Sequence, residues 1–345
     1  MKTLNLVTAS VLSLSIAFPL AFSAERKNAV EQYRKYSAKS VDLESKTKTR
    51  QFQLAQQTSD RIKEMFVEQL NKTHRGLYLK LQKSAESIVK SRMSQKEKDK
   101  KIKQLLAPYQ SLFKKTMANV RVNEDRYLKQ IAGIFRMNPK QLILELVWAI
   151  IGISEQPDDN PIGNSTLSFE APYAFPELQD SAHVLAFGNV TANTQSGTFS
   201  NHAFAIYAGV HLTKAGFSEY FEVPSSVSTV RAESTVNVID YTAKAIGLLG
   251  VGGGSIDTYL EVVSGGQLKC SSQQNISFLF APLLWFMEDE GSQLTTLSCQ
   301  FNPGSNGGNY VISSGAKASA YGALPGGSRA DVHGEVIEMK VRLID

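Results

Sequence analysis

Side chains that could carry out catalysis are few and scattered in this sequence of 345 residues. It contains no Gly-x-Ser-x-Gly elbow, no His-Glu-x-x-His motif and no Walker motif. His202 and His211 bracket one apolar segment, but their odd spacing places them on opposite faces of a strand, which argues against a shared metal site. The sequence therefore predicts a non-enzymatic protein with no catalytic residues, metal ligands or cofactor. A site assembled from distant residues stays open.

The two cysteines, Cys270 and Cys299, are the clearest reactive pair. In an exported chain, two cysteines are expected to form a disulfide that closes a loop of about 30 residues and stabilises by about 3–4 kcal/mol in the chain-entropy model. A thiol catalyst is the alternative, but no histidine lies within ten residues of either cysteine. The sequence favours the disulfide.

Seven lysines cluster before residue 120 and are candidates for anion binding: Lys96, Lys98, Lys100, Lys101, Lys103, Lys114 and Lys115. Such a cluster can bind phosphate, sulfate or lipid headgroups through charge neutralisation. The alternative is that these lysines only keep a helix surface soluble. No aromatic residues alternate with them to stack on bases, so we expect no sequence-specific nucleic-acid binding.

Charge is divided between the two halves of the chain. Residues 25–140 hold 28 Lys and Arg against 12 Asp and Glu, whereas residues 141–345 hold 8 against 20. The halves could attract each other, or the basic half could contact an external polyanion or anionic surface. Charge of this kind informs on partners rather than on fold.

Residues 1–23 resemble a secretory signal peptide. Lys2 precedes an apolar stretch from Val11 to Phe22, and small residues precede a cleavage point after Ser23. The alternative is an uncleaved anchor helix, although the segment is near the lower length limit for spanning a bilayer. The sequence therefore predicts a secreted or periplasmic protein.

Residues 24–154 have helical spacing and predict a basic antiparallel helical bundle. One face is formed by Ile62, Phe66, Leu70, Leu77, Leu81 and Ile88. Pro108 is expected to kink a later helix, and residues 25–50, which are mostly polar, suggest a frayed or solvated helix. The run from Leu142 to Ile153 is apolar nearly all round, so we expect it at the centre of the bundle.

After a linker at residues 155–165, alternation with a period of two replaces the helical spacing. Residues 166–345 contain about ten short strand candidates and predict an antiparallel β-sandwich. In the last strand, Ile337, Met339, Val341 and Leu343 are expected to face the core. The fold class is therefore α+β with two domains, an N-terminal helical bundle followed by a β-sandwich.

Three segments interrupt the strand pattern. Met287–Ser292 is acidic and predicts a turn between two strands. The segments 243–255 and 316–328 are both Ala/Gly-rich, each with a lysine near its start, and predict long hairpin tips. These tips could pack under the helices, or they could enter a membrane or a receptor.

These observations favour an exported binding protein. The sandwich would present a surface to a glycan or a cell-surface protein, and the basic helices would add docking. A membrane-active or pore-forming protein is the second hypothesis, based on Leu142–Ile153 and the two Ala/Gly segments. An enzyme without a recognisable motif is the third.

Overall fold

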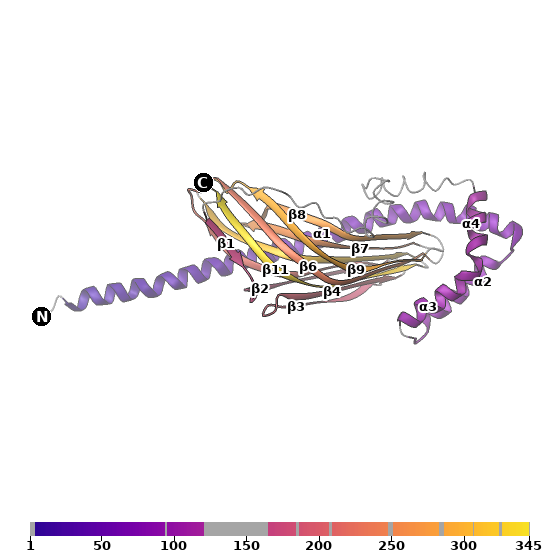
Figure 1. Cartoon of the computed structure of the whole chain (residues 1–345), viewed down its shortest axis with the longest axis horizontal. Coiled ribbons are helices and arrows are strands. Elements are labelled where there is room, and N and C mark those ends of the chain that lie inside the picture. The colour runs from indigo at the N-terminus through magenta and orange to yellow at the C-terminus, as the bar shows by residue number, and fades with distance from the viewer. Residues whose placement is uncertain are drawn as a thin grey trace.

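A computed structural model describes residues 4–93, 95–120, 165–183, 186–206, 209–247, 251–282, 286–305, 307–323 and 326–344. It shows two antiparallel sheets packed face to face and a helical region formed by the N-terminal part of the chain (Figure 1). The predicted β-sandwich is therefore confirmed. The apolar run Leu142–Ile153 and residues 155–164 of the predicted linker lie outside the described residues, so the bundle built around that run and the domain boundaries remain predictions.

The helical region begins with one very long helix. The helices are α1 (Leu4–Thr73), α2 (Leu77–Lys90), α3 (Gln95–Leu106) and α4 (Gln110–Asn119). Gly76, with a φ of 77°, allows the reversal between α1 and α2. Pro108 lies in a 3-10 turn (Ala107–Tyr109) that separates α3 from α4, so the kink expected there is confirmed. Phe66, Leu70, Leu81 and Phe113 share a small core of their own.

Sheet A is six-stranded, with the order β3-β4-β11-β6-β9, and β1 also pairs with β11. Its strands are β1 (Ser165–Phe169), β3 (Ala186–Asn193), β4 (Thr198–Ile206), β6 (Thr229–Ile246), β9 (Phe286–Phe301) and β11 (Gly327–Ile344). Sheet B is five-stranded, with the order β2-β5-β10-β7-β8. Its strands are β2 (Phe175–His183), β5 (Val210–Val223), β7 (Val251–Ser264), β8 (Gln267–Pro282) and β10 (Gly308–Ala323).

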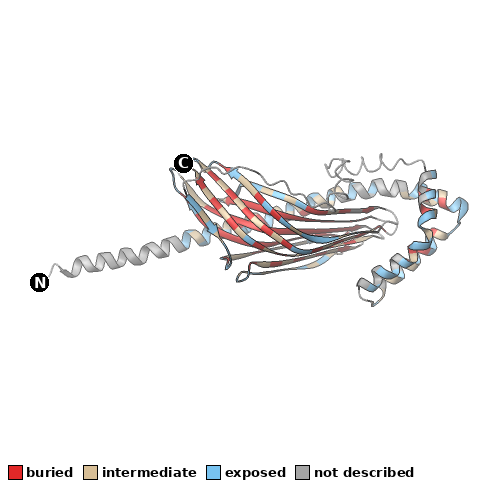
Figure 2. Cartoon of the chain, viewed as in Figure 1, coloured by how far each residue is buried: buried red, intermediate tan, exposed pale blue. Residues whose placement is uncertain are grey.

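The two sheets differ in how many of their faces are buried (Figure 2). Along β6 and β11 of sheet A, buried and less buried residues alternate, as expected for a sheet with one face on the core. In sheet B, β5 is buried at nearly every position. Sheet B has no solvent face there because α1 runs along it and contacts β2, β5, β7 and β10.

The first part of α1 therefore has a structural role that its polar sequence hides. Val30, Tyr33, Ser37, Val41 and Ser45 recur at spacings of three or four residues and are all buried. Val30 and Tyr33 pack against Val263 and Val311 of sheet B. The expectation of a frayed or solvated helix at residues 25–50 is wrong, because this stripe of apolar and small polar residues packs against sheet B.

The inner core changes in side-chain size from one end to the other. Large side chains predominate at the end that holds Phe217, Phe221 and Tyr310, whereas alanines and glycines predominate at the end towards residues 247 and 326. At the second end the sheets are very close, because a Cβ added to Gly252 of β7 would lie 2.2 Å from the Gly327 carbonyl oxygen of β11. The core is therefore a wedge.

Both Ala/Gly segments lie mostly inside strands rather than in long hairpin tips. Residues 243–246 and 251–255 belong to β6 and β7, and residues 316–323 and 327–328 belong to β10 and β11. Their small side chains permit the close approach of the two sheets. Residues 248–250 and 324–325 lie outside the described residues.

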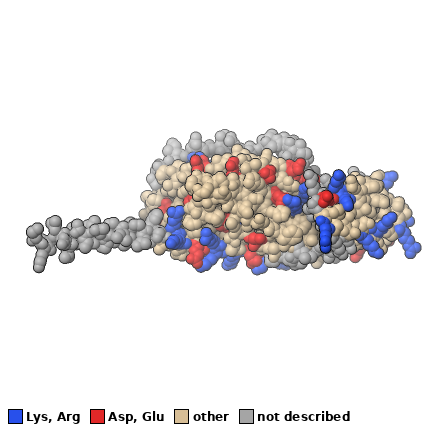
Figure 3. Space-filling model, turned by 90° about the horizontal axis from the view of Figure 1, so that it is seen from below, with Lys and Arg blue, Asp and Glu red and all other residues tan. Residues whose placement is uncertain are grey.

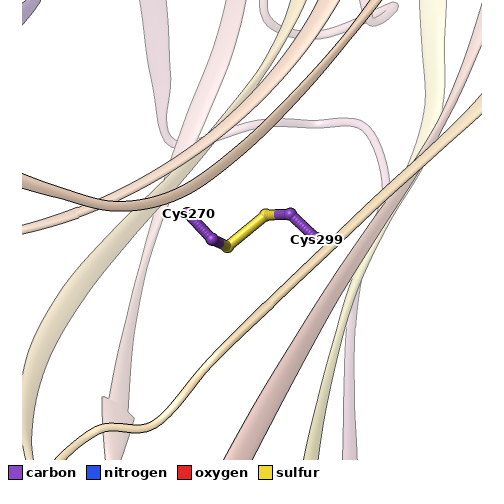
Figure 4. The surroundings of a disulfide bond; sticks show 2 residues. All are labelled: Cys270 and Cys299. Carbon is purple, nitrogen blue, oxygen red and sulfur yellow. A yellow bond between two sulfur atoms is a disulfide. The ribbon is translucent and has the colours of Figure 1, made fainter.

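The disulfide predicted between Cys270 and Cys299 is present, with the two Cα atoms 5.7 Å apart (Figure 4). It joins β8, the edge strand of sheet B, to β9, the edge strand of sheet A. The two half-buried cysteines also pack against the main core. The bond therefore closes one side of the sandwich.

Two other strand predictions need correction. The acidic segment Met287–Ser292 is not a turn but part of β9, where Glu288 pairs in register with Lys244 of β6. Ile337 does not face the core, because a register shift between Val336 and Glu338 leaves it 45% exposed. Met339, Val341 and Leu343 are buried as expected.

No helix within the described ranges is long and apolar enough to cross a membrane.

Candidate functional site

The outer face of sheet A carries an unusual group of side chains where β3, β4 and β11 lie side by side. Strand register aligns Phe187 with Phe204 and Phe204 with Arg329, and one step along it aligns Asn189 with His202 and His202 with Asp331. Because side chains alternate between the two faces of a strand, all six lie on the outer side. We call these six residues the outer-face patch: Phe187, Asn189, His202, Phe204, Arg329 and Asp331.

The patch has an aromatic half. The rings of Phe187 and Phe204 lie with their centroids 4.6 Å apart and their planes at 40°. Phe187 is 58% exposed, which makes it one of the most exposed large apolar side chains of the described chain. A free ring face on a strand is available to an apolar ligand surface.

The other half of the patch is polar and held in place by one carboxylate. Asp331 accepts hydrogen bonds from Nε of Arg329, and its other oxygen contacts Nδ1 of His202. Side-chain exposures are 34% for His202, 23% for Asp331 and 40% for Arg329. These groups are fixed yet accessible, which suits hydrogen bonding to a bound ligand.

The side chains in register with Phe187, Phe204 and Arg329 form a row that continues across the sheet. Lys244 of β6 lies beside Arg329 in register, and its ammonium nitrogen is 2.6 Å from a carboxylate oxygen of Glu288 on β9. The aromatic pair is thus followed by two cations and an anion across neighbouring strands. A ligand that extends along this row would meet apolar and then charged surface.

Sequence reasoning missed this patch. The expectation that His202 and His211 lie on one strand is wrong, because they lie on β4 of sheet A and β5 of sheet B. Each has a carboxylate partner: Asp331 for His202 and Asp180 for His211. In the described part of the chain, neither imidazole is hydrogen-bonded to a hydroxyl group. Neither histidine–aspartate pair is therefore joined by a nucleophile that the histidine could activate as a base. The alternation of residues 198–206 predicted that His202 points outward, but it could not predict which residues of other strands lie beside it.

The predicted lysine cluster lies on α3 and α4. Lys100, Lys101 and Lys115 are exposed, and the side chains of Lys96, Lys98, Lys103 and Lys114 lie outside the described ones. Figure 3 shows Lys and Arg side chains gathered at the end of the molecule that the helices form. Anion binding at this cluster remains a prediction.

A second group of charged side chains lies between α1 and sheet B. The Lys214 ammonium is fully buried, 2.8 Å from Glu261 Oε2 and 3.0 Å from the Ser37 hydroxyl oxygen. Lys317 lies 3.1 Å from Glu44 of α1. The bonds from Lys214 to Ser37 and from Lys317 to Glu44 hold α1 on the sheet. Because α1 covers these charged groups, they are not accessible to a ligand.

The carboxylates of this group have shifted pKa values. Burial alone would raise the pKa of Glu44, but the ammonium groups of Lys48 and Lys317 outweigh burial and lower it to about 2. Burial would likewise raise the pKa of Glu261, but the ammonium groups of Lys214 and Lys317 outweigh burial and lower it. Burial raises the pKa of Glu177, and Lys214 offsets this only in part. The first two carboxylates favour their charged form in the folded protein.

We expect acid to weaken the attachment of α1. Glu44 has a folded pKa below its ordinary value of 4.5, so its contribution, up to about 3 kcal/mol, is present above pH 4.5 and is lost as the pH falls towards 2. Urea unfolding followed between pH 7 and pH 3 should show this loss. Glu44→Gln should flatten the profile, whereas Glu68→Gln, at an exposed position on the same helix, should leave it unchanged. Identical profiles for the wild type and Glu44→Gln would contradict this assignment.

Within the described ranges, no group of three or more His, Cys, Asp and Glu residues could hold a metal ion.

Comparison with known proteins gives no family. No family model matches the sequence, and no curated protein matches it. Among solved structures, the chain is similar to the enzymatically active domain of bacteriophage CBA120 tailspike protein 4, with 7% identity and a TM-score of 0.19 over 48% of this chain and 20% of that one. The chain therefore spans about a fifth of that domain.

Two carbohydrate-binding modules are also similar. TmCBM61, in complex with β-1,4-galactotriose, has 11% identity and a TM-score of 0.19 over 47% of this chain and 86% of the module. The family 11 module from Clostridium thermocellum, in complex with a mixed-linked tetrasaccharide, has 9% identity and a TM-score of 0.16 over 48% and 99%. Similarity at these TM-scores establishes neither a shared fold nor a shared function.

Proposed function

We propose that this protein binds a glycan, without chemical turnover, through the outer-face patch. The observation that carries the proposal is the exposed Phe187–Phe204 pair set directly beside the Arg329–Asp331–His202 cluster on rigid strands. A pyranose ring has an apolar face of C–H groups and an edge of hydroxyl groups. An aromatic ring can cover the first, and charged side chains can donate to and accept from the second.

The shape and composition of the patch favour a glycan over a cell-surface protein. A stable protein interface buries about 800 Å² per partner around a desolvated, largely apolar centre. Here the aromatic pair is bordered on one side by charged groups that are already paired with each other. If a glycan screen found no ligand, a cell-surface protein would become the favoured ligand.

The test is a screen of neutral and anionic oligosaccharides, followed by calorimetry on the best ligand. We expect Phe187→Ala to weaken binding about tenfold or more, because it removes the exposed ring that stacks on the sugar. Leu294→Ala is the matched control, since Leu294 is 56% exposed on β9 at the far edge of the same sheet. Absence of any glycan ligand, or equal losses in the two variants, would overturn the proposal.

Export and anionic-surface binding, which the sequence also predicted, are part of this proposal. The Cys270–Cys299 disulfide is typical of an oxidising compartment, which supports export by a signal peptide. The lysines of α3 and α4 would add affinity for an anionic surface that carries the glycan. The membrane-active alternative stays testable by dye release from anionic liposomes, which a passive glycan binder leaves sealed.

A further inference from the structure

Within the described residues, five strands of the sandwich pair with a neighbour on one side only, and they are not equally protected against pairing with another chain. An open edge presents free N–H and C=O groups, and proteins usually block it with charged residues, proline or a covering element, or keep the edge strand very short. β1 is such a short strand, with five residues. β2 carries Pro176, Glu177 and Asp180, and β9 carries Glu288, Asp289 and Glu290. β8 carries Lys269 and is tied to β9 by the disulfide.

β3 has none of these protections. Over its eight residues, Ala186–Asn193, it contains no charged residue and no proline. Within the part of the chain that the structure describes, it pairs with β4 only. Phe187, Asn189, Thr191 and Asn193 are exposed. β3 is therefore an ordered, neutral strand with one unpaired side.

We propose that β3 pairs antiparallel with β3 of a second copy of this chain, which joins two sheets A into one continuous sheet. Charge favours a second copy as the occupant, because identical copies repel wherever an edge is charged and this edge is neutral. Sheet A is antiparallel throughout, so a two-fold axis beside the open edge of β3, perpendicular to the sheet, extends its ladder without a change of pattern. Each copy supplies the same strand and completes the edge of the other.

Of the registers that keep the outward side chains of both copies on one face, the two with the longest overlap are centred on Asn189 or on Val190. In either register the two Phe187 rings lie about 14–20 Å apart along the strands, at a rise of about 3.4 Å per residue. Both outer-face patches then lie on the same side of one surface. This consequence rests on the proposed function: the dimer would bind an extended or repetitive glycan at two points, with a gain in avidity of 10²–10⁴-fold as the usual range.

The oligomeric state of the full chain tests the pairing. We expect analytical ultracentrifugation to show a dimer for the wild type and a monomer for Thr191→Lys, because lysine on an edge strand blocks pairing. Thr296→Lys is the matched control, since Thr296 is an exposed threonine on β9 at the opposite edge of sheet A, and it should stay dimeric. A monomeric wild type, or equal behaviour of the two variants, would overturn the proposal.

A crosslinking experiment keeps the test independent of how well Thr191→Lys folds. Asn189→Cys treated with a short bis-maleimide should give a covalent dimer on a denaturing gel, and Thr296→Cys should not. Because both natural cysteines are in the disulfide, the new thiol is the reactive one. Absence of crosslinking in a folded Asn189→Cys protein would also exclude the pairing.

Failure of the dimer and failure of glycan binding give different results. Thr191→Lys should bind a short oligosaccharide in solution as the wild type does, but it should lose at least tenfold in apparent affinity for a glycan-coated surface. Phe187→Ala should lose both kinds of binding and remain a dimer. A wild-type dimer without glycan binding would refute only the proposed function, and a monomer that binds glycan would refute only the dimer.

Discussion

Lys214→Ala is expected to lower the free energy of unfolding by about 3–5 kcal/mol, the usual cost of removing one partner from a buried ion pair. The Lys214 side chain is fully buried, and its ammonium lies 2.8 Å from Glu261 and 3.3 Å from the hydroxyl oxygen of Tyr33. Without it, Glu261 and Glu177 would lie under α1 without their main counter-charge. Urea unfolding followed by circular dichroism measures the loss.

Two controls separate the buried charge from ordinary truncation. The double variant Lys214→Met with Glu261→Leu removes both charges and should recover at least half of the loss, because apolar pairs often replace buried ion pairs at little cost. Lys35→Ala breaks a highly exposed pair with Glu31 on the same helix and should cost less than about 1 kcal/mol. A loss below about 1 kcal/mol for Lys214→Ala would mean that these charges do not hold α1 on the sheet.

Deletion of residues 338–345 is expected to unfold the sandwich. β11 is a central strand of sheet A, and in this stretch it pairs with β6 on one side and with β1 on the other. The deletion also removes Met339, Val341 and Leu343 from the core. Near-ultraviolet circular dichroism should lose its native signal, and limited proteolysis should digest the chain rapidly. Lys340→Ala, an outward change in the same stretch, should remain folded.

A deleted protein that is soluble, protease-resistant and cooperative in its unfolding would contradict this prediction. It would show that β1 and β6 can close the gap left by β11 in this part of the sheet.

The sequence predicted the sandwich because its signal is local. Alternation in residues 230–238 and 339–343 places Val230, Val236 and Val341 in the core, and all three are buried. The cysteine pairing was also predictable, since two cysteines in a chain read as exported leave one disulfide. These predictions need no knowledge of which strands are neighbours.

The position of α1 could not be predicted in this way. Lys244 and Lys317 occupy matching places in two similar Ala/Gly segments, but Lys244 is on the outer face of sheet A with Glu288 whereas Lys317 is buried beneath α1 with Glu44. The difference depends only on which sheet each strand joins, and that is set by contacts distant in sequence. A lysine on a strand is normally read as solvent-facing.

The outer-face patch was missed for the same reason. Phe187, His202 and Asp331 come from three strands, and their proximity follows from the β3–β4–β11 register rather than from any spacing along the chain.

The acidic segment at 288–290 was wrongly predicted to be a turn, because charged residues usually mark turns. Here they lie on an edge strand, where charge discourages pairing.

The wedge-shaped core has a further effect on how the two sheets are aligned. If one sheet slid along the other towards the narrow end, its larger inner side chains would move towards alanines and glycines of the opposite sheet, where the two backbones are too close to admit them. A sandwich of uniform thickness has no such barrier to sliding. The gradient in side-chain size therefore opposes sliding and fixes the relative position of the two layers.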